Sequence, residues 1–137
     1  MALKDNKLIS LREIEGAVSP HQGQLDHALK ARKEALEYVA DASKLAEFIG
    51  GKLESLGVGE DWAVSKEIFP GVFVFFIFKR ADDEFPSNLR VLFSGDNIKM
   101  MKGEDLAGFV ILYLIHMLRF VRDTTQDKKL PEVCYRV

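Results

Sequence analysis

The sequence predicts an α+β fold: a small, mainly antiparallel β-sheet of three or four strands, flanked by a long N-terminal helix and a buried C-terminal helix. Three patterns support this prediction. Apolar residues recur at helical spacing over residues 24–49, an unbroken apolar run occupies residues 72–78, and a nearly all-apolar stretch follows Asp105. The strand-like segments follow one another along the chain, so we expect them to pair as a meander.

The first long helix is predicted for residues 24–49. Leucine and alanine recur there at spacings of three and four, and the segment contains no proline. Asp41 and Ser43 weaken the middle of the segment, where the helix could kink. Gly50-Gly51 should end it, because glycine enters the left-handed C-cap conformation without steric cost. Residues 52–56 could add one further helical turn.

Three or four strands are predicted to follow. Trp62 and Val64 alternate with polar neighbours, as in a half-buried strand. Residues 72–78 are all β-branched or aromatic and do not alternate with polar residues, which indicates a central strand buried on both faces. Residues 89–93 have the pattern of a neighbouring strand, and residues 98–101 could form a short edge strand.

The last helix is predicted from Asp105 to about Arg122. Its acidic first turn and basic last turn suit the helix dipole. Apolar residues cover nearly all of its sides, so the helix should be either central or shared with a partner. Its most apolar part, residues 106–118, is shorter than the roughly 20 residues that span a membrane. We therefore interpret it as a buried helix and expect no membrane association.

Composition narrows the class of protein. The 137 residues suit one domain, which we place at residues 24–137 behind an N-terminal arm at residues 1–23. The net charge is −2, and no run of lysine and arginine is longer than a pair, so we expect no nucleic-acid partner. Cys134 is the only cysteine, which excludes an intrachain disulfide and fits a reducing cytoplasm. Residues 1–11 are too charged for a signal peptide.

Residues with catalytic or metal-binding chemistry are few and dispersed. The candidate metal ligands His21, His27, His116 and Cys134 lack the short paired spacing of a zinc site. The chain contains no Gly-x-Ser-x-Gly elbow, and its paired glycines follow a helix instead of a strand, which excludes the usual phosphate loops. We therefore assign no catalytic residue and no metal site, and the cofactor stays unknown.

The acidic turn Asp82-Asp83-Glu84 is the most distinctive polar feature. Its carboxylates could bind a hard cation or rim a ligand pocket. They could equally be exposed turn residues that accept backbone hydrogen bonds, and this structural interpretation is favoured. If a small-molecule site exists, we expect it to combine Asp82, Asp83 and Glu84 with Phe75, Phe85 and Phe93.

The phenylalanines provide a second signal. Seven of them crowd one part of the sequence: Phe69, Phe73, Phe75, Phe76, Phe78, Phe85 and Phe93. A packed core explains most of them, but two long helices cannot easily cover both faces of a sheet. An uncovered face would need another chain, so we expect a homodimer.

Several short motifs fall between residues 48 and 105: Phe48-Ile49-Gly50-Gly51, Gly59-Glu60-Asp61, Phe69-Pro70, Asp82-Asp83-Glu84-Phe85-Pro86, Leu92-Phe93 and Glu104-Asp105. In order and spacing they resemble the C-terminal half of domain-of-unknown-function family 3786, an uncharacterised prokaryotic family. Ser94 stands where members of the family usually have an acidic residue after Leu-Phe. The cysteine-rich iron–sulfur segments of some relatives are missing, so the resemblance implies no iron–sulfur role. The resemblance implies a cytoplasmic α+β domain.

These observations favour a soluble cytoplasmic protein that acts as a non-enzymatic binding or assembly module. The alternative is a small-molecule or cofactor-binding protein, with or without enzymatic activity, that uses the acidic turn and the phenylalanine cluster. The two hypotheses differ in geometry, because the second needs a cavity beside the phenylalanines.

Overall fold

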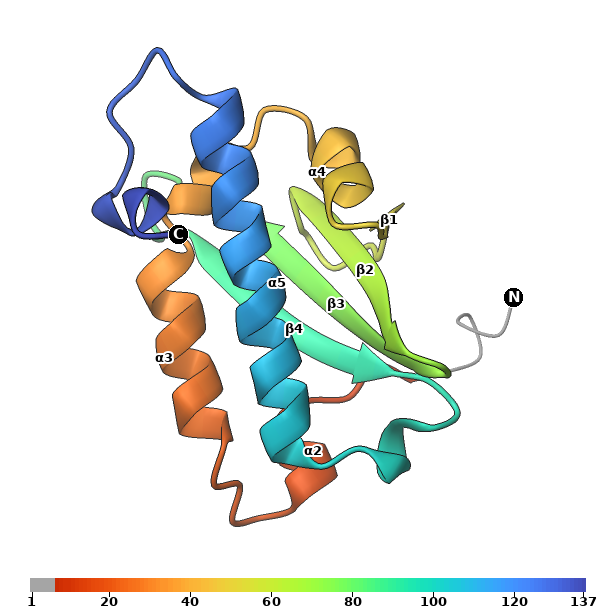
Figure 1. Ribbon diagram of the computed structural model, residues 1–137. Coiled ribbons are helices and arrows are strands. Elements are labelled where there is room, and N and C mark those ends of the chain that lie inside the picture. Colours follow the sequence, from red (N-terminus) through yellow and green to blue (C-terminus); the bar gives the residue numbers. More distant parts are fainter. Residues whose placement is uncertain (1–6) are drawn as a thin grey trace.

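Four strands form one antiparallel sheet in the order in which they occur along the chain (Figure 1). They are β1 (Lys52–Glu54), β2 (Trp62–Phe69), β3 (Val72–Lys79) and β4 (Asn88–Ser94). The computed structural model describes residues 7–137. The strand order is the predicted meander, and the α+β class is confirmed.

Helices pack over one face of this sheet (Figure 1). They are α2 (Leu11–Glu15), α3 (Gln22–Arg32), α4 (Ala42–Phe48) and α5 (Gly103–Thr124), with short 3-10 segments η1 (Ala35–Tyr38), η2 (Ile98–Met100) and η3 (Glu132–Tyr135). Helix α5 crosses the sheet and lies between α3 and α4. It also contacts α2, η1 and η3, so this single helix holds the helical layer together.

Strand β3 is an interior strand, paired with β2 on one side and β4 on the other. Its side chains alternate between the two faces, as the pleat requires. Val74, Phe76 and Phe78 belong to the main core beneath the helices, whereas Phe75 and Ile77 belong to a smaller cluster on the opposite face. The predicted burial of this strand on both sides is confirmed.

The smaller cluster is covered by loops instead of helices. Ala63, Phe75 and Ile77 are buried there, and the partly buried side chains of Leu8 and Leu56 pack against them. Leu8 comes from the N-terminal segment and Leu56 from the connection between β1 and β2. The chain therefore covers much of the sheet face for which the sequence suggested a second copy.

The prediction of one long helix over residues 24–49 is wrong, because the segment forms α3, η1 and α4. Asp41 interrupts the helix: its carboxylate accepts hydrogen bonds from the backbone N–H groups of Ser43 (3.0 Å) and Lys44 (3.4 Å) and caps α4. Aspartate favours such caps over helix interiors. The guanidinium of Arg80 donates hydrogen bonds to the backbone carbonyls of Glu37 (2.6 Å) and Val39 (2.8 Å). These bonds give partners to carbonyl groups at the point where the helix is interrupted.

Two short segments also differ from expectation. Residues 52–56 contain strand β1 instead of a helical turn, because Gly51 lets the chain run close to β2. A Cβ at Gly51 would overlap the backbone carbonyl of Ser65. Residues 98–101 contain the 3-10 turn η2 instead of an edge strand. The outer edge of β4 pairs with Ile9, which exchanges two backbone hydrogen bonds with Phe93 (2.7 and 2.8 Å).

Helix α5 agrees with its prediction and extends two residues beyond it at each end. Its buried side includes Val110, Leu114 and Met117, which are fully buried in the main core. Among the helices in residues 7–137, none combines the length and apolarity that a membrane crossing requires.

The described part of the N-terminal segment contributes to the core. Ser10 and Glu13 form a capping box at the start of α2, and Leu11 is buried in the main core. Residues 1–6 of the predicted arm lie outside the described residues. The boundary between an arm and a domain at residue 23 stays a prediction.

Candidate functional site

The acidic turn is an exposed, locally closed loop. Asp82, Asp83 and Glu84 are all exposed. The Asp82 carboxylate accepts hydrogen bonds from the backbone N–H groups of Glu84 (2.9 Å) and Phe85 (2.8 Å). The hydrogen bond from Phe85 is the largest influence that lowers the pKa of Asp82 below its usual range. Asp82 therefore stabilises the turn as an ionised carboxylate.

The three phenylalanines predicted to line a pocket do not lie together. Phe75 belongs to the smaller cluster, and Phe93 belongs to the main core on the other face of the sheet. Phe85 is 65% exposed in the acidic turn. The structure therefore does not bring these phenylalanines and carboxylates into one cavity. A ligand at any single one of them stays a prediction.

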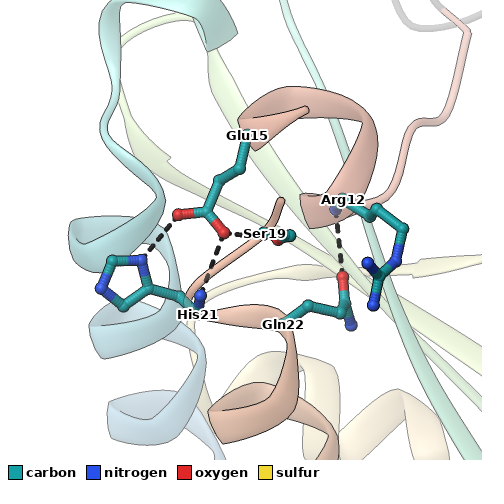
Figure 2. Close-up of polar contacts among 5 residues, drawn as sticks. All are labelled: Arg12, Glu15, Ser19, His21 and Gln22. Atoms are coloured by element: carbon teal, nitrogen blue, oxygen red, sulfur yellow. Dashed lines mark hydrogen bonds and ion pairs between the residues drawn. The ribbon is translucent and has the colours of Figure 1, made fainter. Parts of the chain in front are cut away.

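A second carboxylate, which the sequence did not single out, lies at the centre of a tertiary cluster (Figure 2). Glu15 accepts hydrogen bonds from the Ser19 hydroxyl (2.5 Å) and the His21 backbone N–H (3.2 Å), and its Oε2 lies 2.6 Å from His21 Nδ1. Its side chain is 9% exposed. The hydroxyl of Ser19 is the largest influence that lowers the pKa of Glu15.

The Glu15 cluster also reaches the start of α5. Gly103 is the first residue of that helix, and a Cβ at this position would overlap the Glu15 carboxylate. A negative charge is favourable at this end, because the helix dipole is positive there. Beside the cluster, the side-chain carbonyl of Gln22 accepts a hydrogen bond from the Arg12 backbone N–H (3.0 Å), which joins α2 to α3 (Figure 2).

Serine, histidine and glutamate in one cluster suggest a nucleophilic triad, but their geometry serves another purpose. In a triad the serine hydroxyl is hydrogen-bonded to the histidine, which accepts its proton. Here the hydroxyl of Ser19 donates to Glu15, and His21 contacts the same carboxylate. The cluster therefore fixes the loop between α2 and α3 against α5. The Ser10–Glu13 capping box was a sequence signal for α2, but no local pattern indicated the contacts of Glu15.

A polar cleft lies where the C-terminal tail passes the broken helix. It has a volume of about 420 Å³ and is lined by Glu34, Glu37, Tyr38, Val39, Ala40, Arg80, Lys128 and Pro131. The Arg80 guanidinium is already hydrogen-bonded to two backbone carbonyls at this place. These hydrogen bonds hold η1 to the end of β3, so the Arg80 guanidinium already has partners within the chain.

The outer face of α5 is a row of exposed and half-buried side chains opposite the buried side of the helix. It comprises Asp105, Gly108, Phe109, Leu112, Ile115, His116 and Arg119, which recur at intervals of three and four residues and so share one side of the helix. Leu112 at its centre is 46% exposed. Phe109, Ile115, His116 and Arg119 are half-buried, whereas Asp105 and Gly108 are exposed. We use the name "outer face of α5" for these seven residues.

The remaining candidate residues are not arranged for metal chemistry. In residues 7–137, no group of three or more histidine, cysteine, aspartate or glutamate side chains could hold a metal ion. His116 lies in α5, with its ring centroid 6.1 Å from that of Tyr113. Cys134 is buried, and this burial raises the pKa of its thiol, which disfavours the reactive thiolate.

Comparison with known proteins identifies the family. The model of a family described as a domain of unknown function (DUF3786) matches residues 2–115. The chain belongs to this family. The DUF3786 match extends well beyond the motifs at residues 48–105 and includes α2, α3 and most of α5. No curated protein and no solved structure matches the chain.

The DUF3786 motif residues have structural contacts in this chain. The Glu60 carboxylate accepts hydrogen bonds from the backbone N–H groups of Leu56 (2.6 Å), Gly57 (3.3 Å) and Val58 (2.9 Å) and closes the loop between β1 and β2. Asp61 accepts a hydrogen bond from the Arg80 backbone N–H (2.6 Å). These motifs therefore account for turns of the fold and do not by themselves define an active site.

Proposed function

We propose that this DUF3786 protein is a non-enzymatic binding or assembly module that docks a protein helix on the outer face of α5. The observation that carries the proposal is the exposure of Leu112 on a helix whose opposite side holds the whole helical layer together. A leucine in the middle of a rigid helix offers apolar area without a cost in backbone ordering. The helix that fits this face is amphipathic, with an apolar stripe and charged ends.

The polar clusters favour a binding module over an enzyme. Glu15, Glu60, Asp82 and Arg80 each have their charged groups hydrogen-bonded to backbone or loop atoms of this chain. A general base or nucleophile needs access to a substrate as well as a suitable pKa. The alternative, a small-molecule site at residues 82–84 and the phenylalanines, has less support because those groups are dispersed.

We also place the protein in the cytoplasm. Cys134 is the single cysteine and it is buried, so an oxidising compartment would add no disulfide within this fold. A docking surface made of one apolar residue row with charged ends suits a transient or moderate-affinity contact between proteins.

A site-specific photo-cross-link tests the docking surface. A photoreactive phenylalanine analogue would replace Leu112 in cells that produce the protein, and the same analogue at Leu53 is the matched control, because that leucine is 52% exposed on β1. We expect a discrete adduct from position 112, well above the yield from position 53. Equal or absent adducts at the two positions would contradict the proposed function.

A further inference from the structure

We infer that the helix docked on the outer face of α5 is α5 of a second copy, antiparallel to the first, with the two-fold axis passing beside Leu112. This inference rests on the proposed function and names its partner. In a two-fold interface each surface must be complementary to itself. The residue order along the outer face meets this condition.

The pairing follows from the positions of the residues. In antiparallel helices related by a two-fold axis, residues equally far from the axis in opposite directions lie across from each other. With Leu112 at the axis, Asp105 lies across from Arg119 of the other copy. Phe109 then lies across from Ile115, and Leu112 lies across from its own counterpart.

The chemistry of these pairs is complementary. An acid meets a base at each end, apolar side chains meet between them, and leucine meets leucine at the centre. Gly108 lies across from His116, and space is available there, because a Cβ built on Gly108 has no atom within 4 Å. A ring from the other copy can therefore approach the backbone of α5.

The contact is short. The stretch from Asp105 to Arg119 spans about 21 Å of helix at the usual rise per residue. A single helix pair buries less area than a standard interface, so the dimer should be in measurable equilibrium with the monomer.

The helix dipole offers another explanation for Asp105, because an acid is favourable in the first turn of a helix without any partner. It does not explain Arg119, which lies before the last turn of α5. Charge reversal separates the two explanations. The variants Asp105→Lys and Arg119→Glu each place like charges across the proposed axis, and the double variant restores opposite charges. Under the dipole explanation, the double variant keeps the unfavourable lysine at position 105 and gains nothing from the change at position 119.

Sedimentation of the full chain from roughly 1 μM to 1 mM provides the main test. We expect concentration-dependent dimerisation of the wild type and an increase of about tenfold or more in the dissociation constant of each single variant. The double variant should return to within about threefold of the wild type. Unchanged dimer affinity in the single variants, or no recovery of dimer affinity in the double variant, would contradict the pairing.

A cysteine at position 112 tests the axis itself. Helix axes pack 8–10 Å apart and Cα atoms lie about 2.3 Å from each axis, so the two Cα atoms at a two-fold axis approach to roughly 3.5–5.5 Å. This range overlaps the Cα separation of a disulfide. In a Cys134→Ser background, Leu112→Cys should form a disulfide-linked dimer on mild oxidation. Phe85→Cys, exposed in the acidic turn, is the control and should form little.

The outcomes distinguish this inference from the proposed function. A protein that is monomeric throughout the concentration range, yet forms an adduct with a different protein at position 112 in cells, keeps the docking surface and overturns self-association. A dimer whose dissociation constant is unchanged by the charge reversals, and that does not cross-link at position 112, overturns the antiparallel pairing. A photo-adduct with the mass of two chains, together with recovery in the double variant, supports both.

Discussion

Glu15 and Asp82 each accept hydrogen bonds at the centre of a turn, but they differ in what the turn connects. The partners of Asp82 are the backbone N–H groups two and three residues further along the chain. The carboxylate of Glu15 contacts the loop to α3 and lies against the first residue of α5. Asp82 lies in the most conspicuous acidic run of the sequence, whereas Glu15 is a single acid in a short helix. In this chain the conspicuous acidic run makes local contacts, whereas the single acid makes contacts between separate elements.

The largest effect is expected from Gly103→Ala, which removes the space that Glu15 occupies. The new methyl group would overlap the carboxylate, so the Glu15 side chain must move away from its hydrogen bonds with Ser19 and His21, at a cost of about 1–3 kcal/mol. Thermal or denaturant unfolding measures this loss. Gly108→Ala in the same helix is the matched control, because its site is open, and it should stabilise the monomer by about 0.5–1 kcal/mol. Equal effects at the two positions would show that the Glu15 contact does not matter.

A smaller and pH-dependent effect is expected from Glu15→Gln. The folded-state pKa of Glu15 lies below its ordinary value of 4.5, so its ionised form stabilises the fold above that pH. The variant should therefore have a lower Tm than the wild type at pH 7. This difference should disappear as the pH falls through the folded-state pKa, because the wild-type carboxylate becomes protonated. A difference in Tm that is constant from pH 7 to strongly acidic solution would contradict this account.

The smallest effect is expected from Asp82→Ala. The side chain is exposed and its hydrogen bonds are local, so its loss loosens one turn and leaves the core and α5 in place. The Tm should fall by less than in Glu15→Gln, and dimerisation should not change. Asp83→Ala in the same turn is the control and should leave the Tm near that of the wild type. A loss larger than that of Glu15→Gln would reverse the comparison and point to a role for the acidic turn beyond its own structure.

The elements predicted well are those with strong local patterns. The run at residues 72–78 has no alternation, so its burial on both faces could be predicted without knowing its neighbours. Helix α5 shows helical spacing together with charges that suit its dipole at each end. The Asp82 carboxylate accepts the local backbone hydrogen bonds expected of an acid in a turn, from residues two and three further along the chain. A ligand at this turn stays a prediction.

The elements predicted poorly depend on distant residues. The helix over residues 24–49 breaks where Asp41 caps a new helix and Arg80, far along the chain, binds the carbonyls of η1. Strand β1 has only three residues, which is too short for a clear pattern. It is defined by its pairing with β2, which the close approach of the chain at Gly51 allows. The predicted grouping of Phe75 with Phe93 does not occur, because the two side chains lie on opposite faces of the sheet, as alternation along β4 and its pairing with β3 require.

The sequence by itself determined the α+β class, the central strand and the last helix, since each follows from periodicity within one segment. It also determined that acids and bases lie at opposite ends of one face of α5, because helical spacing fixes which residues share a side. Only the tertiary structure decided that Glu15 lies against Gly103, that loops cover much of the second face of the sheet, and that Leu112 is exposed on the side of α5 opposite its buried residues. Those outcomes depend on packing between segments far apart in the chain, and local patterns carry no information about such contacts.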